Sequence, residues 1–276
     1  ELRGRGLDLP LHFYLSEEWF TPDGASAMAV PFYLAHPRLE KLEEAQMLEV
    51  EGGDRDWCLR ILRHEAGHLV DNMYGLRRRR HRREIFGSSS EPYPEFYAPK
   101  PYSKSYVLHL DAWYAQSHPD EDFAETFAVW LDPGSRWRAR YRGWPALAKI
   151  EYVDRLMTQL RTSRQVCRSR QKVDPVDRLK KTLREHYVAK RERYAAPRSS
   201  RWDADLLRIF SESPRGGGES AVRFLRRHRC EIREEVSRWT GEYVFTLDQV
   251  IKQMLAHPLT DNGLKKFIED YRKAFG

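Results

Sequence analysis

The sequence predicts an α+β fold in which a small sheet and two long helices are followed by an all-helical extension. Two stretches within the first 35 residues alternate apolar and other side chains, as half-buried strands do. Two longer stretches, residues 54–74 and 117–131, carry apolar residues at the spacing of amphipathic helices. Beyond the second of these, helical spacing continues and no strand pattern follows. We therefore expect two domains, residues 1–165 and residues 166–276.

The predicted strands cover residues 7–20 and 27–35. The apolar set of the first strand is Leu9, Leu11, Phe13 and Leu15. Pro31 lies within the second strand and indicates an edge position, because proline has no N–H for a central ladder. Such an edge can pair with an extended substrate, or the proline can simply protect it from aggregation. A short helix within residues 36–46 and a third strand at residues 47–51 are expected next.

The helix predicted at residues 54–74 has a clear beginning and end. Asp54 or Asp56 can cap its N-terminus, and Gly75 can occupy the position just past its last turn. No proline interrupts it, and the absent side chain of Gly67 leaves room for a neighbouring element. We expect this helix to pack closely against another part of the chain.

Within this helix the sequence His-Glu-x-x-His places two imidazoles on one face. His64 and His68 are four residues apart, so that both can bind one metal ion. Glu65 lies between them and can reach a water molecule on that ion. This arrangement is typical of zinc hydrolases.

The second predicted helix, residues 117–131, also has recognisable ends. Ser117 can cap it, Pro119 lies in the first turn, and Asp-Pro-Gly at residues 132–134 ends it. Its buried side is expected to contain Phe123, Phe127, Trp130 and Leu131. A separate face of the helix carries acidic residues over small ones.

A catalytic zinc site needs a third protein ligand, and a fourth position is left to water. Glu121 and Glu125 project one turn apart from the acidic face of the second helix. One of these carboxylates can bind the metal while the other lies behind a ligand histidine and orients its ring. The two helices together can therefore supply a complete site.

Other residues are also candidates for this site. His109 and His118 are possible ligands, whereas Asp71 would need a bend that its helix gives no reason to expect. His118 or Tyr114 can instead donate a hydrogen bond to the oxyanion of a tetrahedral intermediate. A half-buried tyrosine in an aromatic loop is the structural alternative for Tyr114.

Together the two helices resemble the gluzincin branch of zinc metallopeptidases, which carries His-Glu-x-x-His on one helix and Glu-x-x-x-Asp/Glu on a later one. The motifs at residues 64–68 and 121–125 are similar to those of lethal-factor-like metalloproteases. They are also similar to those of bacterial proteins described as "putative zinc-binding metallopeptidases". The resemblance covers about 100 residues, from roughly residue 31 to residue 133.

The resemblance implies a zincin-like fold, a Zn²⁺ cofactor and hydrolysis of peptide bonds by a metal-activated water. The ligands that it implies are His64, His68 and Glu121. It makes Glu65 the general base and Glu125 the carboxylate behind a ligand histidine. Tyr114 is the best-placed match to a tyrosine that, in lethal-factor-like enzymes, precedes the glutamate ligand and binds the oxyanion.

A long irregular stretch, residues 76–113, separates the two helices and is expected to lie over the metal site. Residues 77–83 are dense in arginine. This run fits a solvated helix extension, a clamp for acidic substrate segments, or a surface for polyanions. The aromatic residues of the stretch fit either a substrate-lining loop or packing over the core; they are Tyr93, Phe96, Tyr97, Tyr102 and Tyr106.

The C-terminal part is predicted to be helical and to carry no catalytic cluster. Its expected helices are residues 145–162, 174–187, 221–240, 246–256 and 260–275. We expect this module to shape the cleft or to hold a partner.

Composition limits the setting and the partners. The formal charge of +7 favours acidic partners, so acidic peptides or proteins are the expected substrates. Three widely spaced cysteines do not form a disulfide framework and favour a reducing, cytoplasmic location. No apolar run is long enough to span a membrane, and the arginine run lacks the interleaved aromatics of a nucleic-acid surface.

Two other classes of function stay open on sequence grounds. One is a non-catalytic binding or scaffold protein that uses its arginine-rich segment on polyanions. The other is a zinc hydrolase whose substrate is a non-peptide amide. The motifs do not distinguish this last class from a peptidase.

Overall fold

The computed structural model describes residues 1–94, 99–195 and 221–255. These residues fall into two compact units. Residues 1–45 and 50–181 form the first unit, and residues 46–49 join the described part of residues 182–276 in the second. The domains predicted at residues 1–165 and 166–276 stay predictions.

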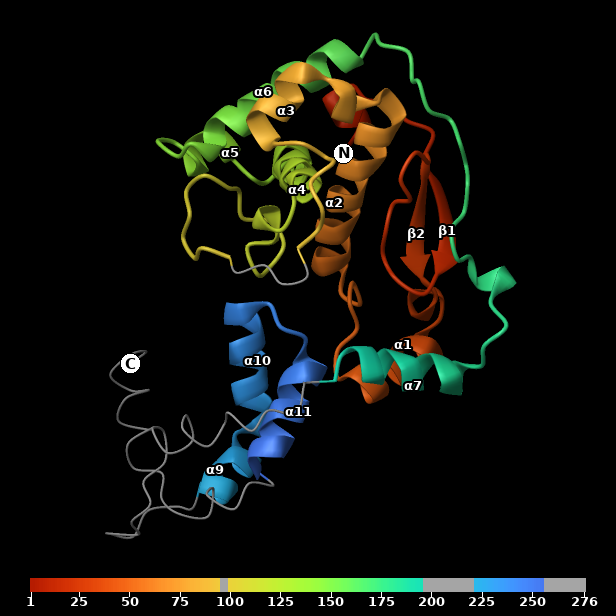
Figure 1. The fold of residues 1–276 in the computed structure, drawn as a ribbon, viewed down its shortest axis with the longest axis vertical. Helices are drawn as coiled ribbons and strands as arrows, with labels where there is room; N and C mark the ends of the chain where they lie inside the picture. Colours follow the sequence, from red (N-terminus) through yellow and green to blue (C-terminus); the bar gives the residue numbers. More distant parts are fainter. Residues whose placement is uncertain (95–98, 196–220, 256–276) are drawn as a thin grey trace. The chain divides into compact units, whose positions relative to one another are not determined.

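The first unit contains a small parallel sheet (Figure 1). Strand β1 (His12–Ser16) pairs with β2 (Ala27–Pro31), so that His12 lies opposite Ala27. The second strand is shorter than predicted, because Phe32–Ala35 turns into a 3₁₀ helix directly after Pro31. The strand predicted at residues 47–51 is wrong: helix α1 (Pro37–Met47) extends into it, and Leu48 has a left-handed φ of 68°. The mostly helical chain and its small sheet are compatible with the predicted α+β class.

The predicted apolar face of β1 is the exposed one. Leu11, Phe13 and Leu15 are 39%, 53% and 42% exposed, whereas Tyr14 and Ser16 are buried. The buried hydroxyls donate to backbone carbonyls of residues 173 and 174, at 3.1 and 2.7 Å. A later part of the chain supplies hydrogen-bond partners for this face, and hydrophobic alternation could not reveal it.

Pairing with an extended substrate was one of two roles considered for the strand predicted at residues 27–35, and this strand is not formed over its full length. The N–H of Ala29 donates to the carbonyl of Phe20 at 2.8 Å, in an antiparallel bridge. Beyond Pro31 the chain is no longer extended. This part of β2 therefore lacks the continuous open edge that strand addition requires.

Helix α2 (Arg55–Tyr74) confirms the first long helix. The Asp54 carboxylate accepts hydrogen bonds from the N–H groups of Asp56 and Trp57, at 3.0 and 2.9 Å. Gly75 ends the helix in the left-handed conformation, with φ 59° and ψ 41°. Both ends follow from local side-chain chemistry, which is why the sequence located them correctly.

Helix α4 (Pro119–Leu131) confirms the second long helix but has a different cap. His118 is the N-cap residue, and its Nδ1 accepts from the N–H of Asp120 at 3.1 Å. The predicted cap, Ser117, instead donates its hydroxyl hydrogen bond to the carbonyl of Tyr114. Every residue from 120 to 131 is buried, including the four predicted apolar ones. The helix that carries the acidic pair is therefore the centre of the unit.

Helices α2 and α4 approach each other closely at Gly67. A Cβ atom added to this glycine would lie 2.7 Å from the Cα and 3.2 Å from the Cβ of Ala124. Real side chains do not tolerate the first of these distances against backbone. The two helices can therefore pack at their observed separation because residue 67 has no side chain.

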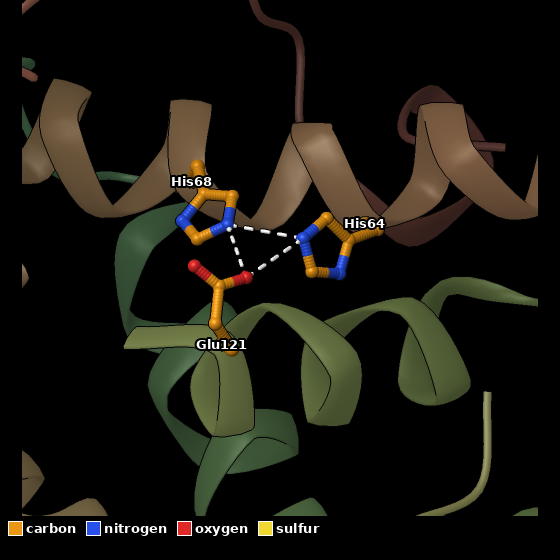
Figure 2. A group of neighbouring side chains, drawn as sticks. All are labelled: His64, His68 and Glu121. Atoms are coloured by element: carbon orange, nitrogen blue, oxygen red, sulfur yellow. Dashed lines mark hydrogen bonds and ion pairs between the residues drawn. The ribbon is translucent and has the colours of Figure 1, made fainter. Parts of the chain in front are cut away.

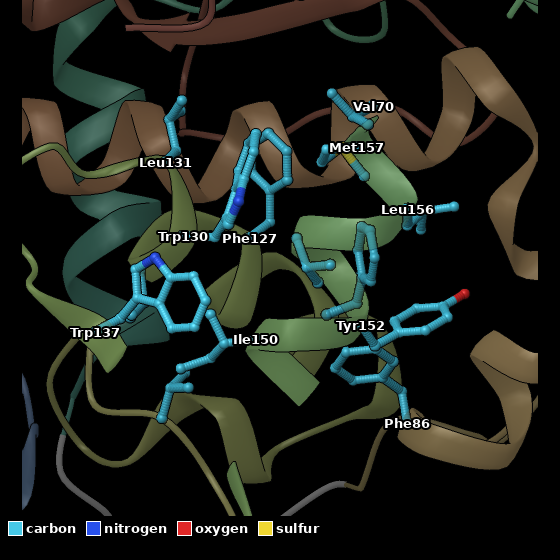
Figure 3. Close-up of a cluster of buried hydrophobic side chains, with 14 of the residues drawn as sticks. Val70, Phe86, Phe127, Trp130, Leu131, Trp137, Ile150, Tyr152, Leu156 and Met157 are labelled. Carbon is cyan, nitrogen blue, oxygen red and sulfur yellow. The ribbon is translucent and has the colours of Figure 1, made fainter. Parts of the chain in front are cut away.

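The main hydrophobic core joins α4 to α6 (Ala146–Leu160) and its neighbours (Figure 3). Residues of this cluster shown in the figure include Val70, Phe86, Phe127, Trp130, Leu131, Trp137, Ile150, Tyr152, Leu156 and Met157. The helix predicted at residues 145–162 is confirmed. The sequence did not predict the short helix α5 (Trp137–Arg140), which precedes α6.

The stretch predicted to be irregular contains a helix. After a 3₁₀ turn, Leu76–Arg78, helix α3 runs from Arg80 to Phe86. Residues 87–94 and 99–113 have no regular secondary structure. Phe96 and Tyr97 of the predicted aromatic loop lie outside the described residues.

The arginine run is partly internal. Arg82 is fully buried, and its Nη2 lies 2.9 Å from Asp71 and 2.6 Å from Asp120. Arg77 pairs with Asp23, Asp71 and Asp120 at 2.7, 3.6 and 3.3 Å. Because a buried arginine needs carboxylate partners, this cluster ties α2, α3 and α4 together, and the reading of the whole run as a solvated extension is wrong.

The second unit contains four described helices, α7 (Leu183–Arg193), α9 (Ala221–Arg227), α10 (Arg229–Thr240) and α11 (Val244–Leu255). The helix predicted at residues 174–187 begins later, because Thr182 and Glu185 form a reciprocal capping box. The helix predicted at residues 221–240 is interrupted at His228. The helix predicted at residues 260–275 lies outside the described residues.

Two further observations concern the cysteines and the hydropathy of the helices. Cys58, Cys167 and Cys230 are free cysteines. Among the described residues, no helix is both long enough and apolar enough to cross a membrane.

The contact at Gly67 gives a first prediction. Gly67→Ala gains about 1 kcal/mol of helix propensity, but the new Cβ forces α2 and α4 apart. We expect a net loss of about 1–3 kcal/mol in the free energy of unfolding, measured by urea denaturation. Gly134→Ala is the control, since its Cβ would meet nothing closer than 3.5 Å. Equal stabilities of both variants and the wild type would contradict the close-packing account.

Candidate metal centre

Three potential ligand atoms from α2 and α4 converge on one point (Figure 2). The Nε2 atoms of His64 and His68 are 3.1 Å apart. The Oε2 atom of Glu121 lies 3.1 Å from the first and 3.2 Å from the second. His64 and Glu121 are buried, and His68 is half-buried. The structure therefore brings together the three residues that the sequence motifs named.

The spacing of these atoms fits a tetrahedral metal ion. Zinc bonds to nitrogen and oxygen of about 2.0–2.1 Å at tetrahedral angles separate the ligand atoms by about 3.3–3.4 Å. The three observed separations, 3.1, 3.1 and 3.2 Å, are close to that value. Two imidazoles and one carboxylate form a donor set typical of catalytic zinc, with the fourth position left open.

Glu125 lies behind His64, one helical turn beyond Glu121. Its Oε1 is 2.8 Å from Nδ1 of His64, and its Oε2 accepts from the N–H of Leu110 at 2.8 Å. The side chain of Glu125 is fully buried. Both oxygens of Glu125 thus have hydrogen-bond partners, and the carboxylate holds the His64 ring in one orientation. Carboxylates behind metal-binding histidines commonly have this role.

The contact with Glu125 also determines what His64 presents to the site. A hydrogen bond to a carboxylate requires the proton on Nδ1, so a neutral His64 carries its lone pair on Nε2. That lone pair faces Oε2 of Glu121 and Nε2 of His68. Such a group of electron-rich atoms is stable only around a positive charge, either protons or a metal ion.

The pKa values of the three residues also show that this group of atoms favours positive charge. Burial of His64 and His68 disfavours their charged forms, but the neighbouring carboxylates outweigh burial and raise both pKa values. Burial of Glu121 opposes ionisation, yet the two imidazoles hold its pKa well below its usual value. The site thus attracts cations despite its burial.

Glu65 is buried beside the ligands and is held by a residue from the N-terminal segment. The Thr21 hydroxyl lies 2.8 Å from Oε2 of Glu65 and 3.2 Å from its backbone oxygen. The sequence placed Thr21 only in a turn. No local pattern could have joined it to Glu65, which lies 44 residues further on.

Tyr114 lies next to the ligands. Its ring centroid is 5.6 Å from that of His64, at an angle of 57°. Burial raises the pKa of its hydroxyl, and the charge of Glu121 raises it further. The hydroxyl therefore stays protonated and able to donate.

The other candidate residues have different hydrogen-bond and ion-pair partners. Both ring nitrogens of His118 are engaged, Nδ1 by the N–H of Asp120 and Nε2 by the carbonyl of Glu91 at 2.8 Å. His118 therefore has no spare N–H for an oxyanion in this arrangement. His109 contacts the backbone oxygen of Arg60 at 2.8 Å, and Asp71 pairs with arginines, so neither joins the ligand group.

Tyr93 contacts the Glu121 carboxylate, and the sequence did not assign it to the metal site. Its hydroxyl donates to Oε1 of Glu121 at 2.7 Å. The sequence placed it among the aromatic residues of the irregular stretch. Its position depends on how that stretch folds back onto α4, which no spacing rule predicts.

Comparison with known proteins supports the metal-binding interpretation. The fold and geometry describe a mostly helical protein with a His-His-Glu group able to hold a metal ion. Residues 58–135 match the family described as "Putative zinc-binding metallo-peptidase". The match covers most of α2 and all of α4, and it confirms the resemblance to this family.

A search of curated proteins finds a short match, and a search of solved structures finds none. Proteins named "Probable transaldolase" from three strains of Clostridium perfringens are 58% identical over 40 residues, which is 14% of this chain. The chain thus spans 19% of the length of these curated relatives. No solved structure matches the chain.

Metal content tests the ligand assignment directly. We expect about one zinc ion per chain in protein purified without chelator, and loss of that zinc in Glu121→Ala. Glu125→Gln should bind zinc about 10- to 100-fold more weakly, since it loses the charge behind His64. Elemental analysis and competition with a chelator measure both. Glu151→Ala, at an exposed carboxylate of α6, is the control, and equal zinc in all four proteins would contradict the assignment.

Acid should weaken metal binding at this site. The raised pKa values of His64 and His68 mean that protons occupy the metal-free site to higher pH than in ordinary histidines. Zinc must displace these protons, so its affinity should increase as pH rises from 6 to 8, with release of protons on binding. Calorimetry in buffers of different ionisation enthalpy measures that release. A pH-independent affinity would contradict ligation by the two histidines.

Proposed function

We propose that this protein is a zinc-dependent hydrolase that cleaves peptide bonds, with His64, His68 and Glu121 as ligands and Glu65 as general base. The observation that carries the proposal is the convergence of three ligand atoms at 3.1–3.2 Å between two buried helices. The family match over the same helices supports it independently. A gluzincin-type site in a zincin-like fold is the finer part of the proposal.

Zinc bound there would lower the pKa of a water molecule and polarise a substrate carbonyl. Side chains of the protein would carry out the proton transfers of the reaction. Glu65 would take the proton that the attacking water gives up and pass it to the leaving amine. The Thr21 hydroxyl, 2.8 Å from Glu65, would keep that carboxylate in a fixed orientation. The burial of Glu65 would restrict exchange of the proton with bulk solvent.

Tyr114 is our proposed donor to the oxyanion that forms when the carbonyl is attacked. Its protonated hydroxyl and its position beside His64 support this role. His118 is the weaker candidate, because its two ring nitrogens hold the beginning of α4 and the carbonyl of Glu91.

Acidic peptides or proteins remain the proposed substrates, in a cytoplasmic setting. Arg78, Arg79, Arg80 and Arg83 are exposed next to the site-bearing helices and could favour acidic segments. Burial of Arg82 in carboxylate pairs removes this one arginine from any polyanion-binding surface. The short match to transaldolases covers too little of the chain to support that activity.

Replacing the general base separates chemistry from metal binding. Glu65→Gln should keep its zinc and lose about 10²- to 10⁴-fold in kcat, because the amide cannot accept the proton. Cleavage of a peptide library containing paired acidic and basic sequences measures both the rate and the substrate preference. Glu151→Gln is the matched control on an exposed surface. A Glu65→Gln protein that contains zinc and hydrolyses peptides at the wild-type rate would refute this assignment.

A further inference from the structure

Tyr93 reaches the site from outside the two ligand helices. It lies in the irregular segment after α3, and its hydroxyl donates to Oε1 of Glu121 at 2.7 Å. The side chain is 58% exposed. It is therefore at the rim of the site, with its polar end turned inward.

The ring of Tyr93 is held against the beginning of α4. It stacks on the imidazole of His118, with centroids 3.9 Å apart and planes inclined by 11°. His118 is itself fixed, because its Nδ1 caps α4 and its Nε2–H donates to the carbonyl of Glu91. A ring with this support can present its hydroxyl at a defined place.

The segment before Tyr93 is also docked on α4. The Ser89 hydroxyl donates to Oδ1 of Asp120 at 2.5 Å. Gly87 has a φ of 102°, and a Cβ added there would lie 3.1 Å from Cγ of Pro119. Tyr93 thus follows a segment that has several contacts with the same helix end, immediately before Glu121.

The two oxygens of Glu121 have different partners. Oε2 is the atom that faces both histidines, as Figure 2 shows. Oε1 accepts the hydrogen bond of Tyr93. We infer that Tyr93 is a positioning residue that keeps Glu121 a one-oxygen ligand of the metal, an inference that rests on the proposed function.

The physical reason lies in competition for the lone pairs of one oxygen. A carboxylate can bind a metal through one oxygen or through both. A short hydrogen bond from a phenol to Oε1 withdraws electron density from that oxygen and fixes the plane of the group. Glu121 would then bind a metal through Oε2 alone, which would leave a position on that metal available to water and substrate.

This role differs from that of the other tyrosine at the site. Tyr114 contacts the His64 ring and is our proposed donor to the substrate oxyanion. Tyr93 contacts the ligand carboxylate itself. Removal of the Tyr93 hydroxyl should change the coordination of the metal and its affinity. Removal of the Tyr114 hydroxyl should instead lower turnover and leave metal coordination and affinity unaltered.

The test uses the full chain loaded with Co²⁺, whose visible absorption is intense in four-coordinate sites and weaker when the coordination number rises. Tyr93→Phe keeps the ring that stacks on His118 and removes only the hydroxyl. We expect a weaker cobalt absorption and a zinc dissociation constant raised about 10-fold. Tyr102→Phe is the matched control in the same irregular stretch, since Tyr102 is 72% exposed. Far-UV circular dichroism checks that each variant is folded.

The possible outcomes separate this inference from the proposed function. A wild-type spectrum in Tyr102→Phe and Tyr114→Phe, together with a weakened one in Tyr93→Phe, supports the inference. A wild-type protein that binds cobalt and zinc, with an unchanged spectrum in Tyr93→Phe, overturns the inference and leaves the hydrolase proposal standing. Weakening by Tyr114→Phe to the same degree overturns the distinct role of Tyr93. Failure of the wild-type protein to bind either metal overturns both proposals.

Discussion

The close packing of α2 against α4 is the contact on which the rest of the site depends. His64 and His68 come from one helix and Glu121 from the other, so the separation of the ligand atoms is set by the separation of the helices. Gly67 and Ala124 allow that separation, since any larger side chain at residue 67 would meet the backbone of α4. The hydrogen bond from His64 to Glu125 crosses the same interface. The contact between α2 and α4 thus determines both the packing of the two helices and the spacing of the candidate ligand atoms.

Local signals in the sequence named the three residues whose side chains the structure brings together. The caps and glycine end of α2 fix the helix, and a four-residue spacing on a helix fixes the relative positions of two histidines regardless of the remaining fold. The acidic pair on α4 has the same property. Each motif therefore defines the relative positions of its own residues, whereas the meeting of the two helices and the separate roles of Glu121 and Glu125 came from the resemblance to zinc metallopeptidases.

The features that the sequence did not predict depend on contacts between distant residues. The buried face of β1 is polar because residues 173 and 174 accept its hydrogen bonds. Arg82 is internal because Asp71 and Asp120 pair with it there, although His81 and Arg83 on either side of it are exposed. Thr21 and Tyr93 reach Glu65 and Glu121 from segments with no regular pattern. Periodicity reports which face of an element is apolar, and it contains no information about which distant polar group will cover the other face.

The candidate ligands His68 and Glu121 lie 53 residues apart in the chain, and this has a thermodynamic consequence. An ion bound by both helices acts as a cross-link that the unfolded chain cannot form with comparable affinity. By linkage, free zinc at about 1,000 times its dissociation constant would stabilise the native state by about 4 kcal/mol. The melting temperature of such a protein is then a function of zinc concentration. Chelation of a zinc ion bound there would also weaken the contact between α2 and α4.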